Sequence, residues 1–205
     1  MPISNTSSSK FASKLASILS SLLERTANKN DSTILTKTKH SPFRGENKPS
    51  ITIRAYLERI IRYTDCSPCC FLVAYIYLDR LALNCPETVI NSFSVHRLLI
   101  TSVMVAAKFM DDLHYSNAYY ARVGGIEVSE MNYLELELLF GLQFELNVSP
   151  NQFNSYCTML EAEMCLESVS PISKLQCFSS QEKHEEENGE KPKIQVQTEV
   201  KISTC

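Results

Sequence analysis

The sequence has 205 residues, of which 44% are apolar and 21% charged, and its formal net charge at pH 7 is −3. This length suits one domain of about 100–150 residues with tails, and it is short for two domains. Because each neutralised phosphate needs a cation, the acidic balance disfavours a protein that binds the nucleic-acid backbone.

The N-terminal region, residues 1–49, is expected to precede the main domain. Its first ten residues are polar, and we expect them to be disordered. Apolar side chains then recur at helical spacing, which predicts an amphipathic helix over residues 11–25. Residues 28–48 are rich in Asn, Ser, Thr, Lys and Pro and are interpreted as a linker.

Residues 50–165 contain the signals of five helices, and no period-two alternation or hairpin signal interrupts them. The domain is therefore expected to be all-α. The third helix, over about residues 94–110, is the most apolar and should form the centre of the packing. A short helical turn is expected at Asn117–Arg122. The five helices should begin at cap signals at Ser50, Ser67-Pro68, Ser94, Ser129 and Ser149-Pro150.

The apolar pattern ends before residue 166, and Gln181–Lys191 has no apolar side chain. Residues 166–205 are therefore expected to be a disordered, charged tail. Alternation over Ile194–Ile202 allows a short strand, but an isolated strand would lack a partner.

Eight cysteines occur without a recognisable signal peptide, which predicts reduced thiols in a nuclear or cytoplasmic protein. An organelle transit peptide is the alternative for the Ser-rich start. Cys66 and Cys69 form a CxxC motif that suits a redox or zinc site, although no second close pair is present. The ordinary interpretation is two small residues of the packed interior, so no metal or cofactor is predicted.

Two charged side chains occur in strongly apolar helices, Asp79 in the second and Lys108 in the third. Buried charges are almost always paired, and Arg54 is the candidate partner of Asp79. Lys108 either extends into solvent from its helix end or faces a partner protein. Asp111-Asp112 is interpreted as a surface or partner-facing pair. No constellation of side chains indicates an enzyme.

Four segments, in order, resemble the anchor segments of a cyclin box. They are IRAYLERI at 53–60, AYIYLDR at 74–80, VAAKFMDD at 105–112 and YLELELLFGLQFEL at 133–146, and SYCTMLE at 155–161 would close the box as its fifth helix. The stretch over residues 91–126 is similar to plant U-type cyclins, also called P-type, which resemble the yeast phosphate-signalling cyclin. The resemblance implies a single five-helix box at residues 50–165 with an added N-terminal amphipathic helix and disordered tails.

The resemblance also implies a regulatory subunit that is not itself an enzyme. It would bind and activate a cyclin-dependent kinase, by expectation an A-type kinase with the PSTAIRE motif, in cell division or nutrient-linked signalling. Arg54 and Asp79 match the family's internal ion pair, and Lys108 and Glu135 match its kinase-contacting pair. Neither a nucleic acid nor a membrane is an expected partner. A cyclin-fold adaptor for a non-kinase partner, such as a transcription complex, is the alternative.

Two further features concern substrates and modification. Larger cyclins carry a Trp in a first-helix patch that docks substrates, and the residue at that position here is Ile60. Docking through a patch of Ile53, Leu57 and Ile60 is therefore less expected. Ser41 begins a Ser-Pro-Phe-Arg sequence that suits a cyclin-dependent kinase, which makes it a candidate phosphorylation site.

Overall fold

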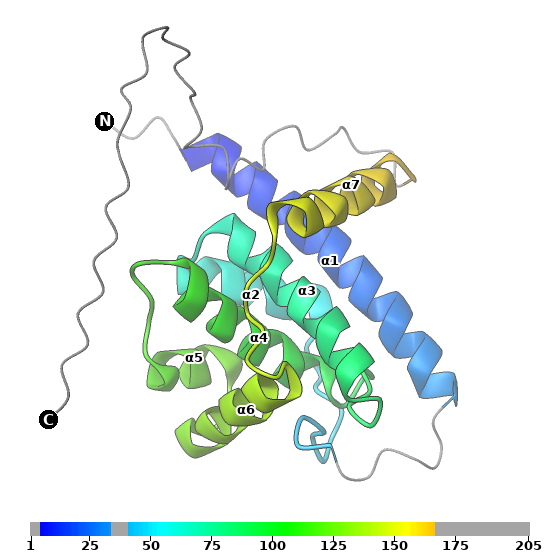
Figure 1. The fold of residues 1–205 in the computed structure, drawn as a ribbon, viewed down its shortest axis with the longest axis vertical. Helices are drawn as coiled ribbons and strands as arrows, with labels where there is room; N and C mark the ends of the chain where they lie inside the picture. Colours follow the sequence, from blue (N-terminus) through cyan, green and yellow to red (C-terminus); the bar gives the residue numbers. More distant parts are fainter. Residues whose placement is uncertain (1–4, 34–40, 167–205) are drawn as a thin grey trace, which may run out of the picture. The chain divides into compact units, whose positions relative to one another are not determined.

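The computed structural model describes residues 5–33 and 41–166, and the described part is all-helical, as predicted (Figure 1). The predicted disordered tail and the possible strand at Ile194–Ile202 lie outside the described residues. The helices are α1 (Asn5–Thr33), α2 (Ile53–Thr64), α3 (Pro68–Asn84), α4 (Val95–Met110), α5 (Asn117–Gly124), α6 (Val128–Gly141) and α7 (Pro150–Leu166).

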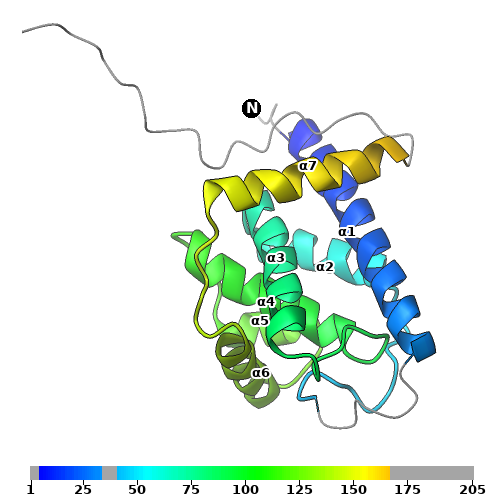
Figure 2. The same cartoon turned by 45° about the vertical axis from the view of Figure 1, so that its right-hand side comes forward.

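Helix α4 is the central helix of the fold, as its apolar sequence predicts. It packs against α2, α3, α5 and α6, and most of its side chains are buried, including two hydroxyls at Thr101 and Ser102. Those hydroxyls donate to the carbonyls of Arg97 and Leu99, so neither of these two buried hydroxyls is left without a partner. Figure 2 shows α3 in front of α4, with α7 across one end of α3.

The helix starts agree with the predicted cap signals at some positions and differ at others. Ser67 and Ser94 are the N-cap residues of α3 and α4, and the Ser149 hydroxyl accepts from the Gln152 amide at the start of α7. Helix α2 is capped by Thr52 and not by Ser50, because the Thr52 hydroxyl accepts from the Ala55 amide at 3.1 Å. Helix α6 starts after Glu127, so Ser129 lies inside its first turn.

Helix α1 is longer than the predicted amphipathic helix. Residues 5–10 are helical where disorder was expected, and the helix runs to Thr33, into the predicted linker. Tertiary hydrogen bonds account for the C-terminal extension. Asn30 Nδ2 donates to the Ile90 carbonyl at 2.8 Å, and the Asp31 carboxylate accepts from the amide and hydroxyl of Ser92.

The apolar stripe of α1 belongs to the same core as the box helices. Leu15, Leu19 and Leu23 are buried, and α1 packs against α2 and α7. The N-terminal helix is therefore a structural layer of the domain and covers α2 from one side (Figures 1 and 2).

None of the helices in the described ranges combines the length and the apolar character that crossing a bilayer requires.

Candidate functional site

The predicted pair Lys108 and Glu135 is brought together by the fold. Lys108 Nζ donates to Glu135 Oε1 at 2.6 Å, across the packed helices α4 and α6. Glu135 Oε2 accepts from Asn117 Nδ2 at 2.6 Å, and the same nitrogen donates to Asn132 Oδ1 at 2.8 Å. Both oxygens of the carboxylate are thus held, one by α4 and one by α5.

The surroundings of this pair leave it partly open to solvent. The side chains of Lys108 and Glu135 are 27% and 17% exposed. Lys108 lies in the last turn of α4, where the partial negative charge of the helix C-terminus favours a cation. Within the described part of the chain, its ammonium donates to Glu135 alone, so two of its three N–H donors remain for a partner.

Large apolar side chains are exposed next to the pair and along α6. Phe109 follows Lys108 and Leu136 follows Glu135, and about half of each side chain is exposed. Phe140, one turn after Leu136, is 66% exposed and packs edge-on against Phe144 at a centroid distance of 5.3 Å. A half-buried ion pair beside exposed aromatic and aliphatic groups is typical of a protein-binding surface.

The turn after α6 holds two non-glycine residues in the left-handed region. Gln143 has φ 55° and Phe144 has φ 58°. Such residues are uncommon outside glycine because the Cβ crowds the backbone, and they are enriched in tight turns and at functional sites. The consequence here is a solvent-exposed Phe144 next to Phe140.

The predicted ion pair between Arg54 and Asp79 is not formed, and this prediction is corrected. Arg54 is exposed and pairs with Glu58 one turn along α2, at 3.1 Å. Asp79 instead accepts from the Tyr156 hydroxyl at 3.1 Å. Burial raises the pKa of Asp79, and the hydrogen bond from Tyr156 opposes that rise. Arg54 is one residue after the buried Ile53, and this single step around the helix axis turns its side chain away from the core and toward solvent.

The first-helix patch, where docking was less expected, lies inside the domain. Ile53, Leu57 and Ile60 are all buried in the core, where α2 packs against α1, α4 and α5. They stabilise the domain and do not form a docking surface.

The candidate phosphorylation site is enclosed. The Ser41 hydroxyl is buried, and among the described residues it has no hydrogen-bond partner. Its carbonyl accepts from the Arg44 amide in a turn, so the Ser-Pro sequence is folded against the domain. A kinase would have to open this turn to reach Ser41.

The cysteines of the CxxC motif do not face each other as a pair. Cys66 interacts with Cys70, whose thiol lowers the pKa of Cys66, while the same interaction and burial raise the pKa of Cys70. Cys70 also donates to Asp111 Oδ2 at 3.4 Å. Cys66, Cys70, Cys85 and Cys157 are free.

Cys69 is disulfide-bonded, so the expectation of reduced thiols is wrong for this residue. Sequence spacing alone does not show whether two sulfur atoms come within bonding distance. Within the described ranges, no group of three or more His, Cys, Asp or Glu side chains is arranged to hold a metal ion.

Asp111 and Asp112 have different roles. Asp111 Oδ2 accepts from the Ser67 amide at 3.0 Å, at the start of α3, where the helix dipole favours an anion. Asp112 is exposed.

Sequence reasoning did not identify Asn117 as a residue of the site. Asn117 begins the short helix α5, which was expected only as a helical turn. The available signal was a polar side chain at the start of that turn.

Comparison with known proteins identifies the family. The model of the family described as Cyclin matches residues 6–146. Cyclin-U4-1 of Arabidopsis thaliana is 60% identical over 78% of this chain and 80% of that protein. Cyclin-P4-1 of Oryza sativa subsp. japonica is 49% identical over 82% of this chain and 83% of that protein, and Cyclin-U4-3 of Arabidopsis thaliana is 57% identical over 72% and 67%. The chain therefore belongs to the cyclin family, in its plant U/P-type branch.

Proposed function

We propose that this cyclin is a non-catalytic regulatory subunit that binds and activates a cyclin-dependent kinase in the nucleus or cytoplasm. The expected partner is an A-type kinase with the PSTAIRE motif. The observation that carries the proposal is the half-buried pair of Lys108 and Glu135, bordered by exposed Phe109 and Leu136.

The chemistry of this surface suits a kinase helix and its flanking backbone. The two remaining donors of Lys108 can bind backbone carbonyls, and Glu135, fixed by Asn117, keeps the ammonium in place. Phe109, Leu136, Phe140 and Phe144 supply apolar area that a partner would remove from water. By binding the active arrangement of the kinase αC helix more tightly than the inactive one, the cyclin would shift the kinase toward activity.

The proposal is tested by reversing the charges of the pair. We expect Lys108→Glu to weaken kinase binding at least about tenfold and to abolish activation of histone phosphorylation, since the change removes the ammonium donors and places two carboxylates side by side. Glu135→Lys should behave in the same way. Far-UV circular dichroism should be unchanged, because the pair is partly exposed and lies at the edge of the core.

The double variant Lys108→Glu/Glu135→Lys separates binding from folding. It restores an internal ion pair but reverses both charges toward the partner, so kinase binding should stay lost. Arg25→Glu is the matched control, because it breaks another 2.6 Å ion pair, with Glu163, between α1 and α7. Normal activation by the double variant would show that the pair is only internal. Capture of a non-kinase complex through the same residues would overturn the kinase assignment.

A further inference from the structure

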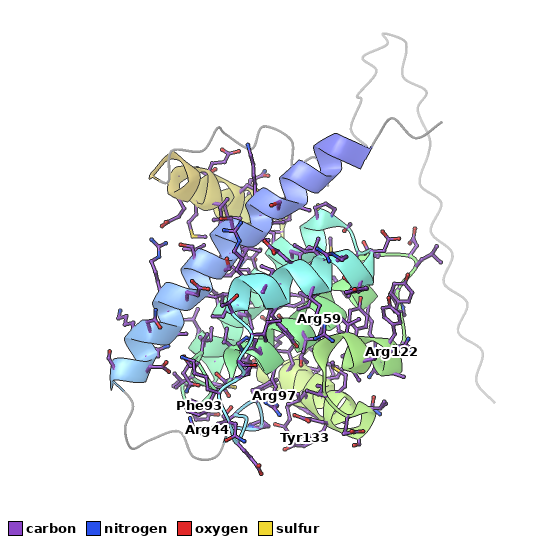
Figure 3. All side chains as sticks on the ribbon, turned by 180° about the vertical axis from the view of Figure 1, so that it is seen from behind. Arg44, Arg59, Phe93, Arg97, Arg122 and Tyr133 are labelled. Carbon is purple, nitrogen blue, oxygen red and sulfur yellow. The ribbon has the colours of Figure 1, made fainter. Side chains whose placement is uncertain are left out.

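A basic groove lies between α2 and α5, and neither Lys108 nor Glu135 lines it. Its volume is about 540 Å³, and its walls include Glu58, Arg59, Arg62, Tyr63, Tyr119 and Arg122. Figure 3 shows Arg59 and Arg122 on the same face of the molecule, one from each helix, with Arg44 well apart from them.

Positive charge dominates this groove although the whole chain is acidic. Three guanidinium groups line it, and the one carboxylate on its wall, Glu58, accepts from Arg54 at 3.1 Å. Arg59 Nη2 donates to the carbonyl of Arg122 at 3.3 Å, so the Arg59 guanidinium lies next to the backbone of Arg122. Because Arg59, Arg62 and Arg122 have no ion pair with a carboxylate in the described ranges, the groove carries a net positive charge.

The walls of the groove are held in position by contacts between the two helices. The Tyr119 hydroxyl donates to the Tyr63 carbonyl at 2.6 Å, and the Tyr56 hydroxyl donates to the Gly124 carbonyl at 3.0 Å. The Arg122 guanidinium lies 5.2 Å from the centre of the Tyr119 ring, which limits its movement. The ring of Tyr115 stacks on the ring of Tyr119, with the two ring centroids 4.0 Å apart.

We propose that this groove binds the phosphate of a phosphorylated Ser or Thr in a partner protein. A planar guanidinium donates two parallel hydrogen bonds to phosphate oxygens, and a dianionic phosphate can engage two or three such groups at once. Arginine clusters are a recurring means of phosphopeptide recognition, and the tyrosine walls offer apolar area to the flanking residues. The arginines lie in a groove between two helices, whereas a membrane surface or a nucleic-acid backbone would need a broad basic face.

This proposal does not depend on the kinase contact. It uses α2 and the Tyr119–Val123 part of α5, while the kinase contact uses the end of α4, one face of α6 and, through Asn117, the start of α5. The two can therefore fail separately, and the phosphopeptide site is tested on the isolated full chain without a kinase.

The test measures binding of short fluorescent peptides of degenerate sequence by fluorescence anisotropy. One pool has a central phosphoserine, a second has Ser there, and a third has Glu. We expect the full chain to bind the phosphoserine pool at least about tenfold more tightly than either other pool, since the charge and geometry of phosphate match several guanidinium groups.

Substitutions in the groove should remove this preference. Arg59→Glu/Arg122→Glu should weaken binding of the phosphoserine pool at least about tenfold, and Arg59→Lys/Arg122→Lys should have a smaller effect, because Lys keeps the charge but loses the bidentate geometry. Arg44→Glu is the control: it makes the same charge change at an exposed arginine that lies over Phe93 and outside the groove. If the double reversal disturbs folding by circular dichroism, Arg62→Glu tests the same groove from the exposed side of α2.

Several results would overturn the proposal. They are equal binding of the phosphoserine and Glu pools, unchanged binding by the folded Arg59→Glu/Arg122→Glu or Arg62→Glu protein, and an equal loss in Arg44→Glu. Binding of anionic phospholipid vesicles through these arginines, with no binding of the phosphoserine pool, would assign the groove to a membrane.

Discussion

Individual polar side chains in this protein take their partners from distant parts of the sequence. His96 is buried at the start of α4, and its Nε2 donates to the Ile51 carbonyl at 3.0 Å. The ring packs edge-on against Tyr56 at a centroid distance of 4.9 Å. Its Nδ1 atom is buried, and no described residue forms a hydrogen bond with it. This environment suits a neutral imidazole, because protonation would place an N–H donor where there is no acceptor.

The buried position of His96 makes stability depend on pH. Burial lowers the pKa of His96 below its usual value; the hydrogen bond to Ile51 opposes this, and the nearby charges of Lys48 and Arg97 add to it. In the unfolded chain the group has a pKa of about 6.5, so the unfolded state binds more protons as the pH falls through that value. We expect the free energy of unfolding to fall by about 1 kcal/mol between pH 7.5 and pH 5.5.

Urea unfolding at several pH values measures this effect. His96→Gln, which cannot gain a proton in this range, should flatten the pH dependence. His114→Gln at an exposed position should keep it. An equal slope in the wild-type protein and His96→Gln would show that another group controls acid stability.

At the level of the elements, α1 contributes to the hydrophobic core of the domain. It places leucines at positions 15, 19 and 23 in the core and ties its C-terminal end to the Ile90–Ser92 segment. An isolated amphipathic helix gains little from propensity alone, so its 29-residue length depends on packing against α2 and α7. The prediction of a separate N-terminal helix therefore understated its role.

Removal of one core leucine from α1 should destabilise the whole domain. We expect Leu19→Ala to lower the free energy of unfolding by about 2–4 kcal/mol, because it removes buried methyl groups and leaves a cavity. Leu22→Ala, three residues later on the same helix but only partly buried, should cost about half as much or less. Urea denaturation followed by circular dichroism compares the two. Equal, small losses in both variants would mean that α1 is not anchored to the core.

At the level of the whole molecule, one core supports two separate surfaces. The pair of Lys108 and Glu135 lies where α4, α5 and α6 meet, and the basic groove lies between α2 and α5. Both surfaces are carried by helices that pack on α4, directly or through a neighbour. Helix α1 adds to the same core from the side of α2.

A shared core predicts a single cooperative unfolding transition. In hydrogen-exchange mass spectrometry at increasing urea concentration, peptides from the middle of α1 and from α3 should lose their most protected amides at the same concentration. Peptides from the exposed turn at Asp112–Tyr115 provide the control for local opening and should exchange early. Loss of α1 protection at clearly lower urea would show that it unfolds as a separate unit.

The sequence by itself determined the helical class, the family and the approximate helix positions. Apolar residues at a spacing of three and four specify which face of a helix is buried, and this periodicity is local. Ser67 and Ser94 marked their helix starts correctly for the same reason. The association of Lys108 with Glu135 was predictable because the motifs around them resemble those of other cyclins, and periodicity did not supply it.

Only the tertiary structure decided which side chains meet. A rotation of one residue along α2 directs Arg54 to solvent and to Glu58, so Asp79 is satisfied by Tyr156 from α7. The basic groove likewise exists only because α2 and α5, separated by more than one helix in sequence, lie side by side. Spacing along the chain constrains contacts within a helix, whereas contacts between helices depend on how the buried faces pack together.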